Sequence, residues 1–302
     1  MNASCLKIAL ILSAVLYGSA AAQQTTTPAS EEAWIPLYET VDAELQAALE
    51  ARIAQQPAWQ RLVTRRRLAI GVVDLGRHDA TPKFARINGN QMMYAASLPK
   101  IAILLAAYAS FEDGSLEETA ELHQDLTDMI RVSSNAAATR VLDAVGMSKL
   151  EQVMRDPQFG FYDESRGGGL WVGKRYASTG PRHGDPLLNI SHGATVTQVS
   201  RFYYQLAEGH LINAERSEQM LADLADPGIH HKFVAAIERR APLARIFRKS
   251  GTWQNWHADS VLVRGPQWRN YILVALVESP DGEQILRELV PAVEELLNPA
   301  HN

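Results

Sequence analysis

The chain has 302 residues, of which 46% are hydrophobic and 21% are charged, and its formal net charge is -5 at pH 7. A negative net charge gives no reason to expect nucleic acid or an anionic membrane surface as a partner. The only cysteine is Cys5. A chain that loses this residue on processing has no disulfide, no thiolate zinc site and no cysteine nucleophile.

The N-terminal segment has the composition of a secretory signal peptide. Lys7 precedes an apolar run over 8–16, and the small residues over 18–22 end in an Ala-x-Ala pattern. The run is shorter than the roughly 20 residues of a membrane-spanning helix. We therefore expect residues 1–22 to be removed, residues 23–34 to form a flexible tether, and the protein to be periplasmic or secreted without a membrane anchor. The alternative is a buried N-terminal helix.

Hydrophobic periodicity then predicts the elements in chain order. They are a helix (39–55), two strands (68–75 and 83–87), a buried helix (97–110), six further helices (116–132, 135–145, 148–155, 195–208, 215–225 and 230–239), three strands (244–249, 258–263 and 270–277) and a last helix (281–297). The segment from 156 to 194 is irregular and rich in Gly, Asp, Pro and His, and loops of this length often line a site.

The order of these elements predicts an α/β (α+β) fold with two lobes. Strands from both ends of the chain would form one five-stranded antiparallel sheet flanked by helices, with about 35–95 and 240–302 in this lobe. Residues of about 96–239 would form an all-helical lobe, so that 35–302 is a single catalytic domain. A site is expected in the cleft between the lobes.

The first of three short motifs is Ser97-Leu-Pro-Lys100. One helical turn separates the serine from the lysine, which places their side chains on one face. A neutral lysine amine can take the serine proton if burial or a nearby cation lowers the pKa of the lysine. The N–H of Ser97 and one near Thr252 would form an oxyanion hole. By itself, Ser-x-x-Lys also occurs by chance.

The second motif is Ser133-Ser-Asn135, between two predicted helices. A serine in this place can pass a proton to a leaving nitrogen, and an asparagine can bind both an amide substrate and the lysine. The alternative is that Asn135 is a helix N-cap, because serine and asparagine are common caps.

The third motif is Lys249-Ser-Gly251, followed by Thr252, at the end of a predicted strand. Glycine lets a ligand approach the backbone closely. Lys249, Ser250 and Thr252 would offer a positive charge and two hydroxyls to a substrate carboxylate. The alternative is an ordinary turn at the end of a strand.

Together, and in this order, the three motifs resemble those of class A β-lactamases and serine penicillin-binding proteins, which share a fold. The resemblance covers nearly all of the sequence after the signal peptide. It implies acylation of Ser97 by a β-lactam or a D-alanyl-D-alanine-like peptide, with no cofactor. It also implies roles for Lys100 (base), Ser133 (proton relay), Asn135 (substrate and lysine contact), and Lys249, Ser250, Gly251 and Thr252 (substrate binding). Two positions depart from the family pattern, because Ser134 replaces an aspartate and Ser250 a threonine.

The resemblance is weakest at the residue that would act as the base for deacylation. Class A enzymes carry Glu-x-x-Leu-Asn in a loop, and this chain has Asp185-Pro-Leu-Leu-Asn189. Aspartate is one methylene shorter, which makes it a poorer holder of the hydrolytic water. Asp185 is therefore either the base or a turn residue before Pro186. Glu164 is a weaker candidate, because no Leu-Asn pair follows it.

The nine histidines do not indicate a metal site, because none shows the His-x-x-x-His spacing of a helical zinc site. The sequence thus predicts a monomeric serine hydrolase of the class A β-lactamase type, with a small-molecule β-lactam as substrate. One alternative is a D,D-peptidase that acts on cell-wall peptides and deacylates slowly. The other is a sensor domain that is acylated without turnover.

Overall fold

The computed structural model describes residues 34–76, 81–298 and 300 of the protein. The chain divides into the units Met1–Trp34 and Ile35–Asn302, and the fold below is that of the second unit. The predicted signal peptide and nearly all of the predicted tether lie outside the described residues.

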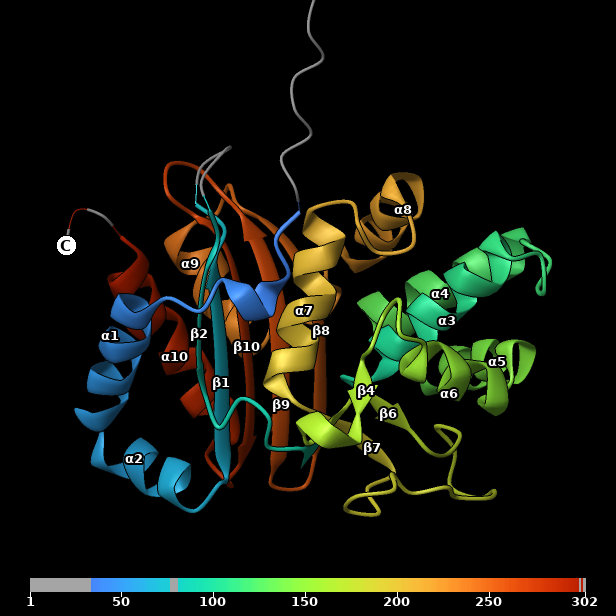
Figure 1. The fold of residues 1–302 in the computed structure, drawn as a ribbon, viewed down its shortest axis with the longest axis horizontal. Coiled ribbons are helices and arrows are strands. Elements are labelled where there is room, and N and C mark those ends of the chain that lie inside the picture. The colour runs from blue at the N-terminus through green and yellow to red at the C-terminus, as the bar shows by residue number, and fades with distance from the viewer. Residues whose placement is uncertain (1–33, 77–80, 299, 301–302) are drawn as a thin grey trace, which may run out of the picture. The chain divides into compact units, whose positions relative to one another are not determined.

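A five-stranded antiparallel sheet is the central element of this unit (Figure 1), with strand order β2-β1-β10-β9-β8. The strands from the two ends of the chain meet where β1 pairs with β10, so that Leu68 lies opposite Val277. This confirms the predicted sheet. The third motif, however, lies inside a strand, because β8 continues past Lys249 to Trp253. The bounds are β1 (Leu68–Asp74), β2 (Lys83–Ile87), β8 (Arg245–Trp253), β9 (Trp256–Arg264) and β10 (Asn270–Glu278).

Helices cover both faces of the sheet (Figure 1). Leu68, Ile70 and Val72 of β1 pack into an apolar core with four helices. These are α1 (Ala43–Ala54), α2 (Pro57–Thr64), α9 (Phe233–Arg240) and α10 (Gly282–Leu297). Successive strand residues point to opposite faces, and Gly71 accordingly faces α7 (Val196–Ala207), where a Cβ would lie 2.6 Å from Ser200 Oγ. The missing side chain lets α7 approach the sheet closely.

The other helices surround α3, which is buried on nearly all sides, as its continuous apolar sequence predicts. Helix α3 spans Lys100–Glu112, and the helices around it are α4 (Ala120–Arg131), α5 (Asn135–Val145), α6 (Met147–Arg155) and α8 (Ala214–Leu224). The predicted start of α3 at Ser97 was wrong. The N–H of Lys100 donates to Ser97 O, three residues back, and Pro99 is the N-cap, so Ser97 lies in a tight turn.

Two helices of the range that we assigned to the helical lobe pack elsewhere. Helix α7 lies on the sheet, and α9 lies against α10 and β9. Periodicity predicts that a helix has a buried face but does not identify the neighbour. Among the described residues, no helix combines the length and the apolar character that crossing a membrane requires.

The segment 156–194 is largely irregular, as predicted, but short strands fix it beside the first motif. A three-stranded sheet has the order β3-β7-β6, and a two-stranded one joins β4 and β5. Because β3 ends just before Ser97, this pairing places the segment next to the first motif. The bounds are η1 (Leu37–Glu39), β3 (Met93–Tyr94), β4 (Tyr162–Asp163), η2 (Glu164–Arg166), β5 (Gly168–Gly169), β6 (Trp171–Val172) and β7 (His192–Ala194).

Candidate active site

Ser97 lies in the tight turn that joins β3 to α3. Ala96, directly before it, has a φ of +50°, in the left-handed region that side chains rarely adopt. The N–H of Leu98 donates to Ala95 O at 3.0 Å and closes the turn. Ser97 is partly exposed, and among the described residues no group forms a hydrogen bond with its Oγ. The hydroxyl is therefore accessible to a ligand.

Lys100 is fully buried and contacts the second motif. Its Nζ donates to Ser133 O at 2.7 Å and to Asn135 Oδ1 at 2.8 Å. Burial lowers the pKa of Lys100 from 10.5 to about 7, because a charge is poorly solvated away from water. Roughly half of the lysine is therefore neutral at pH 7. The two N–H groups of the neutral amine satisfy the two short contacts, which leaves its lone pair to accept a proton.

The second motif lies in the link between α4 and α5. Ser133 has a φ of +58°, and Ser134 is the N-cap of α5, since its side chain accepts a hydrogen bond from Ala137 N at 3.2 Å. The alternative in which Asn135 is the cap is therefore wrong. Asn135 is the first residue of α5, and its side chain turns toward Lys100.

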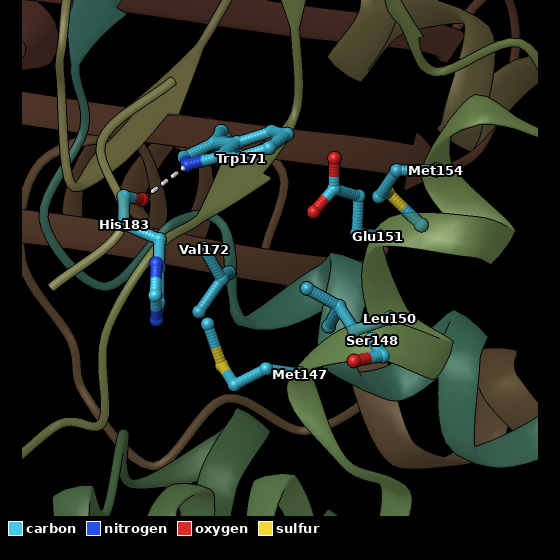
Figure 2. Close-up of a pocket in the computed structure, with 8 residues that line it drawn as sticks. All are labelled: Met147, Ser148, Leu150, Glu151, Met154, Trp171, Val172 and His183. Atoms are coloured by element: carbon cyan, nitrogen blue, oxygen red, sulfur yellow. Dashed lines mark hydrogen bonds between the residues drawn. The ribbon is translucent and has the colours of Figure 1, made fainter. Parts of the chain in front are cut away.

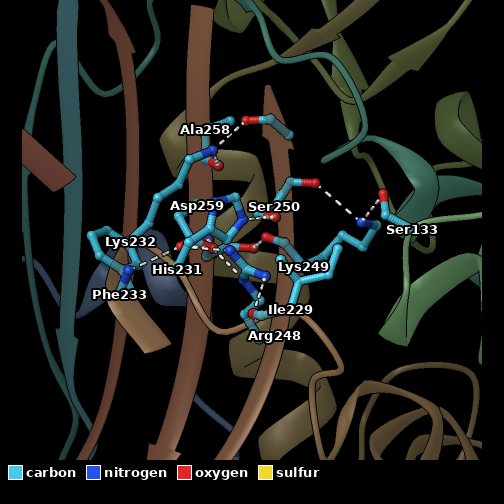
Figure 3. Close-up of polar contacts among 12 residues, drawn as sticks. Ser133, Ile229, His231, Lys232, Phe233, Arg248, Lys249, Ser250, Ala258 and Asp259 are labelled. Carbon is cyan, nitrogen blue, oxygen red and sulfur yellow. Dashed lines mark hydrogen bonds and ion pairs between the residues drawn. The ribbon is translucent and has the colours of Figure 1, made fainter. Parts of the chain in front are cut away.

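Lys249 of β8 reaches across to the second motif (Figure 3). Its Nζ donates to Ser133 Oγ at 2.8 Å, and Lys100 Nζ lies 3.4 Å from the same oxygen. Burial, with the nearby charges of Lys100 and Arg248, lowers the pKa of Lys249 well below its ordinary value. A bound anion would restore the charged form of this lysine.

Gly251 lies against the Ser97 turn. A Cβ at this position would lie 2.0 Å from Ala95 O and 2.7 Å from Ser97 N, so a residue with a side chain does not fit. Strand β8 is at the edge of the sheet, and this contact brings its backbone beside the N–H of Ser97. The oxyanion hole that we expect from Ser97 and the strand near Thr252 remains a prediction.

A second layer of charged residues supports β8 from behind, and no sequence motif indicated it (Figure 3). The buried Lys232 donates from Nζ to Gly251 O at 2.6 Å and to Thr252 Oγ1 at 2.7 Å. An ammonium only donates hydrogen bonds, so the Thr252 hydroxyl has to direct its own proton elsewhere. Ser250 Oγ lies 3.5 Å from His231 Nε2.

Arg248 and Asp259 form a buried ion pair beneath this layer. Arg248 donates from Nε and Nη2 to the two oxygens of Asp259 at 2.7 and 3.0 Å. Asp259 also accepts from Phe233 N at 3.1 Å, which ties the start of α9 to the sheet. Since Lys100, Lys232 and Lys249 lie close by, the site gathers positive charge, which favours an anionic ligand.

Asp185 is buried, and its carboxylate holds its own loop together. One oxygen accepts from Leu187 N at 3.0 Å, Leu188 N at 3.1 Å and the Tyr162 hydroxyl at 3.2 Å. The other oxygen accepts from Ile190 N at 2.6 Å. Within the described structure, Asp185 has no hydrogen bond to any of the three motifs. These contacts favour the turn-residue alternative, and a role as base remains a prediction.

Other residues that the sequence singled out lie apart from the motifs. Glu164 in η2 accepts from Arg155 Nη1 at 3.1 Å on the surface. His230 is exposed and lies 2.7 Å from Glu238 Oε1. In the part of the chain that the structure describes, no three His, Cys, Asp or Glu side chains are grouped in a way that would hold a metal ion.

Tyr176, which sequence reasoning missed, lies directly on the first motif. Its ring centroid is 4.5 Å from Lys100 Nζ, and its hydroxyl donates to Ala96 O at 3.2 Å. Its ring also packs on that of His192, with centroids 4.4 Å apart. Burial lowers the pKa of His192 to about 4, so this imidazole is neutral at pH 7. A single tyrosine within an irregular segment gives no periodic signal that would identify it.

A pocket of about 150 Å³ lies between α6 and β6 (Figure 2). Met147, Leu150 and Trp171 give it a mostly apolar lining, and Trp171 Nε1 donates to His183 O at 2.9 Å. None of the residues of the three motifs lines this pocket. It is therefore separate from the candidate active site.

Comparisons with known proteins bear on the family and the fold of the chain. A family model described as "Beta-lactamase enzyme family" matches residues 117–296, whereas no curated protein sequence matches the chain. The chain is similar in structure to the beta-lactamase of Sphaerobacter thermophilus DSM 20745, with 16% identity, a TM-score of 0.61, and coverage of 87% of this chain and 98% of the other.

Two further solved structures give the same result. The last common ancestor of Gram-negative bacteria beta-lactamase class A has 16% identity and a TM-score of 0.63, over 82% of this chain and 99% of that one. PBP-A has 16% identity and a TM-score of 0.60, over 84% and 95%. These similarities confirm the predicted fold class.

Proposed function

Because the chain belongs to the beta-lactamase enzyme family, we propose that it is a serine hydrolase that opens β-lactam rings through an acyl-enzyme on Ser97. The observation that carries the proposal is the convergence of Lys100 and Lys249 on Ser133, next to the Ser97 turn. A variant of the structurally similar PBP-A is described as an acyl-enzyme complex with penicillin G.

The contacts of these residues support the following course of acylation. Neutral Lys100 takes the proton of the Ser97 hydroxyl, and Oγ forms a bond to the carbonyl carbon of the lactam. The carbon–nitrogen bond of the ring then breaks. The nitrogen takes the proton of Ser133 Oγ, which receives one from Lys100 in return, so that Lys100 is neutral again. Lys249, which donates to Ser133 Oγ, stabilises the alkoxide character of this oxygen during the transfer.

The positive side of the site would bind the carboxylate of the substrate. Lys249 supplies a charge, and the hydroxyls of Ser250 and Thr252 supply hydrogen bonds. Thr252 is prepared for this role because its oxygen already accepts from Lys232. Its own proton is therefore free for an anion.

A second candidate function is that of a D,D-peptidase or penicillin-binding protein with slow deacylation. It is favoured by the carboxylate of Asp185, whose two oxygens are occupied by contacts within its own loop. A carboxylate held in this way is poorly placed to activate a water at Ser97. Acylation is common to both candidates, and the lifetime of the ester separates them.

The test is the intact mass of the protein as a function of time after mixing with excess penicillin G. A drug-sized adduct on the wild type that is missing from Ser97→Ala supports acylation at Ser97. Decay of the adduct as the drug is consumed identifies a β-lactamase, whereas a lasting adduct identifies a penicillin-binding protein or a sensor. An unchanged mass in the presence of a drug that stays intact would reject the proposal.

From the N-terminal sequence we further propose that the chain is exported to the periplasm or medium. We also propose that it acts there as a monomer. Residues 1–22 have the order of charge, apolar run and small residues that signal peptidases cleave. N-terminal sequencing of the exported protein is expected to begin near residue 23. Recovery of the full-length chain from the cytoplasm alone would contradict export.

A further inference from the structure

The loop residue Tyr176 contacts both ends of the first motif. Its ring lies over Lys100 Nζ, 4.5 Å from the ring centroid, and its hydroxyl binds Ala96 O, in the residue just before the nucleophile. The ring of His192 packs against that of Tyr176, with centroids 4.4 Å apart. The segment 156–194 thereby covers the lysine that would have to activate water.

The groups that face Lys100 divide into polar and aromatic ones. On the side of α5, Ser133 O and Asn135 Oδ1 accept hydrogen bonds from the amine. On the side of the loop, the aromatic face of Tyr176 lies over the amine. An aromatic face attracts a cation without hydrating it.

Neither ring at this position is a good base, because Tyr176 keeps its proton and burial lowers the pKa of the His192 imidazole to about 4. Burial raises the pKa of Tyr176 well above its ordinary value, and its proton is already donated to Ala96 O. His192 Nε2 lies 3.2 Å from Lys174 O. Of these three groups, Lys100 is the one best suited to activate water during deacylation.

We propose that Tyr176 is a positioning residue that prolongs the life of the Ser97 acyl-enzyme by covering Lys100 and keeping water away from it. The inference rests on the proposed acylation of Ser97. In the deacylation step, the oxygen of a water forms a bond to the ester carbon while one of its protons passes to neutral Lys100. The bond from this carbon to Oγ then breaks, and Lys100 returns the proton to Oγ. The ring occupies the approach that this water needs.

The test compares acylation and deacylation rate constants in four variants by intact mass after removal of excess penicillin G. Tyr176→Ala and Tyr176→Gln are expected to shorten the half-life of the ester, once it has formed, at least about tenfold. Tyr176→Phe keeps the ring and is expected to retain the lifetime of the wild type. Tyr94→Ala is the matched control, because Tyr94 also packs on His192 but not on Lys100.

Several outcomes would overturn the inference. One is a lifetime in Tyr176→Ala and Tyr176→Gln that equals or exceeds that of the wild type although both are acylated normally. Another is a shortening in Tyr176→Phe or Tyr94→Ala as large as in Tyr176→Ala, which would assign the effect to the hydrogen bond or to general loosening. If no variant and no wild-type protein forms an adduct, acylation of Ser97 itself is rejected, and the inference with it.

Discussion

Ser133 Oγ accepts hydrogen bonds from two lysines that have different tasks. Lys249 is the closer donor, at 2.8 Å, and Lys100 lies 3.4 Å away. Once Lys100 has taken the proton of Ser97 and a bound anion has restored the charge of Lys249, both lysines only donate, so the hydroxyl proton of Ser133 has to point to a third group. In the proposed reaction this group is the leaving nitrogen, so the two lysines orient the proton that the reaction uses.

The pKa of Lys100 predicts how acylation depends on pH. Since burial lowers this pKa to about 7, the neutral fraction increases as the pH rises through 7. The acylation rate constant is therefore expected to rise about tenfold per unit below pH 7 and to level off above it. Stopped-flow measurements from pH 5 to pH 9 would check this.

Lys100→Ala serves as the control for this profile. Loss of the base is expected to lower acylation about a hundredfold or more at pH 8. A rate for the wild type that is highest at pH 5, or that does not change across the range, would contradict the assignment of Lys100 as the base.

Gly251→Ala is expected to lower the rate constant of acylation about a hundredfold or more. The added Cβ would meet Ala95 O at 2.0 Å and Ser97 N at 2.7 Å, so the nucleophile turn has to move, and small displacements of reacting groups cost about a hundredfold in rate. The matched control is Gly265→Ala, whose Cβ would meet only side-chain atoms, the nearest at 3.1 Å. Penicillin acylation of Gly251→Ala at the rate of the wild type would show that this contact is unimportant.

At the scale of elements, the loop from β6 to β7 shows what the sequence reveals and what it does not. Its irregularity and its place beside the site follow from composition and length. The role of Asp185 does not, because the pattern Asp-x-x-Leu-Asn is compatible both with a base and with a carboxylate that binds the N–H groups of its own turn. Only the positions of Leu187 N and Ile190 N distinguish the two.

Strands and helices were predicted more completely than the side chains around the site. An apolar run such as that of β1 has to be buried, and its short length and β-branched residues favour a strand over a helix. The places of Lys232 and Tyr176 in the site result from contacts between segments far apart in sequence. No local sequence pattern encodes such contacts. The start of α3 was misplaced because Pro99 fits both a first helical turn and a cap.

Asp185→Ala is expected to destabilise the loop without lengthening the life of the acyl-enzyme. The change leaves the N–H groups of Leu187, Leu188 and Ile190 without their acceptor, at a cost of about 2 kcal/mol. Thermal unfolding and limited proteolysis would measure the loss of stability, and intact mass would measure the lifetime. Glu164→Ala, on the surface, is the control and is expected to change neither. A longer-lived adduct in Asp185→Ala would identify this residue as the base.

At the scale of the whole molecule, the ion pair of Arg248 and Asp259 joins the site to the core. Asp259→Asn leaves the buried guanidinium without a counter-charge and is expected to lower the free energy of unfolding by about 3–5 kcal/mol. Denaturant titration would measure this. Glu295→Gln, which removes the exposed pair with Arg52, is expected to cost less than about 1 kcal/mol. Equal effects of the two variants would contradict the structural role of Asp259.

The pairing of β1 with β10 also constrains how the protein is made. Because Leu68 pairs with Val277, the middle of the sheet forms only when nearly the whole chain has left the ribosome. Until then the apolar residues of β1 have no partner on one side, and pairings of such long range form slowly. A nascent chain that stalls before β10 is therefore a substrate for chaperones or proteases rather than a smaller folded version of the protein.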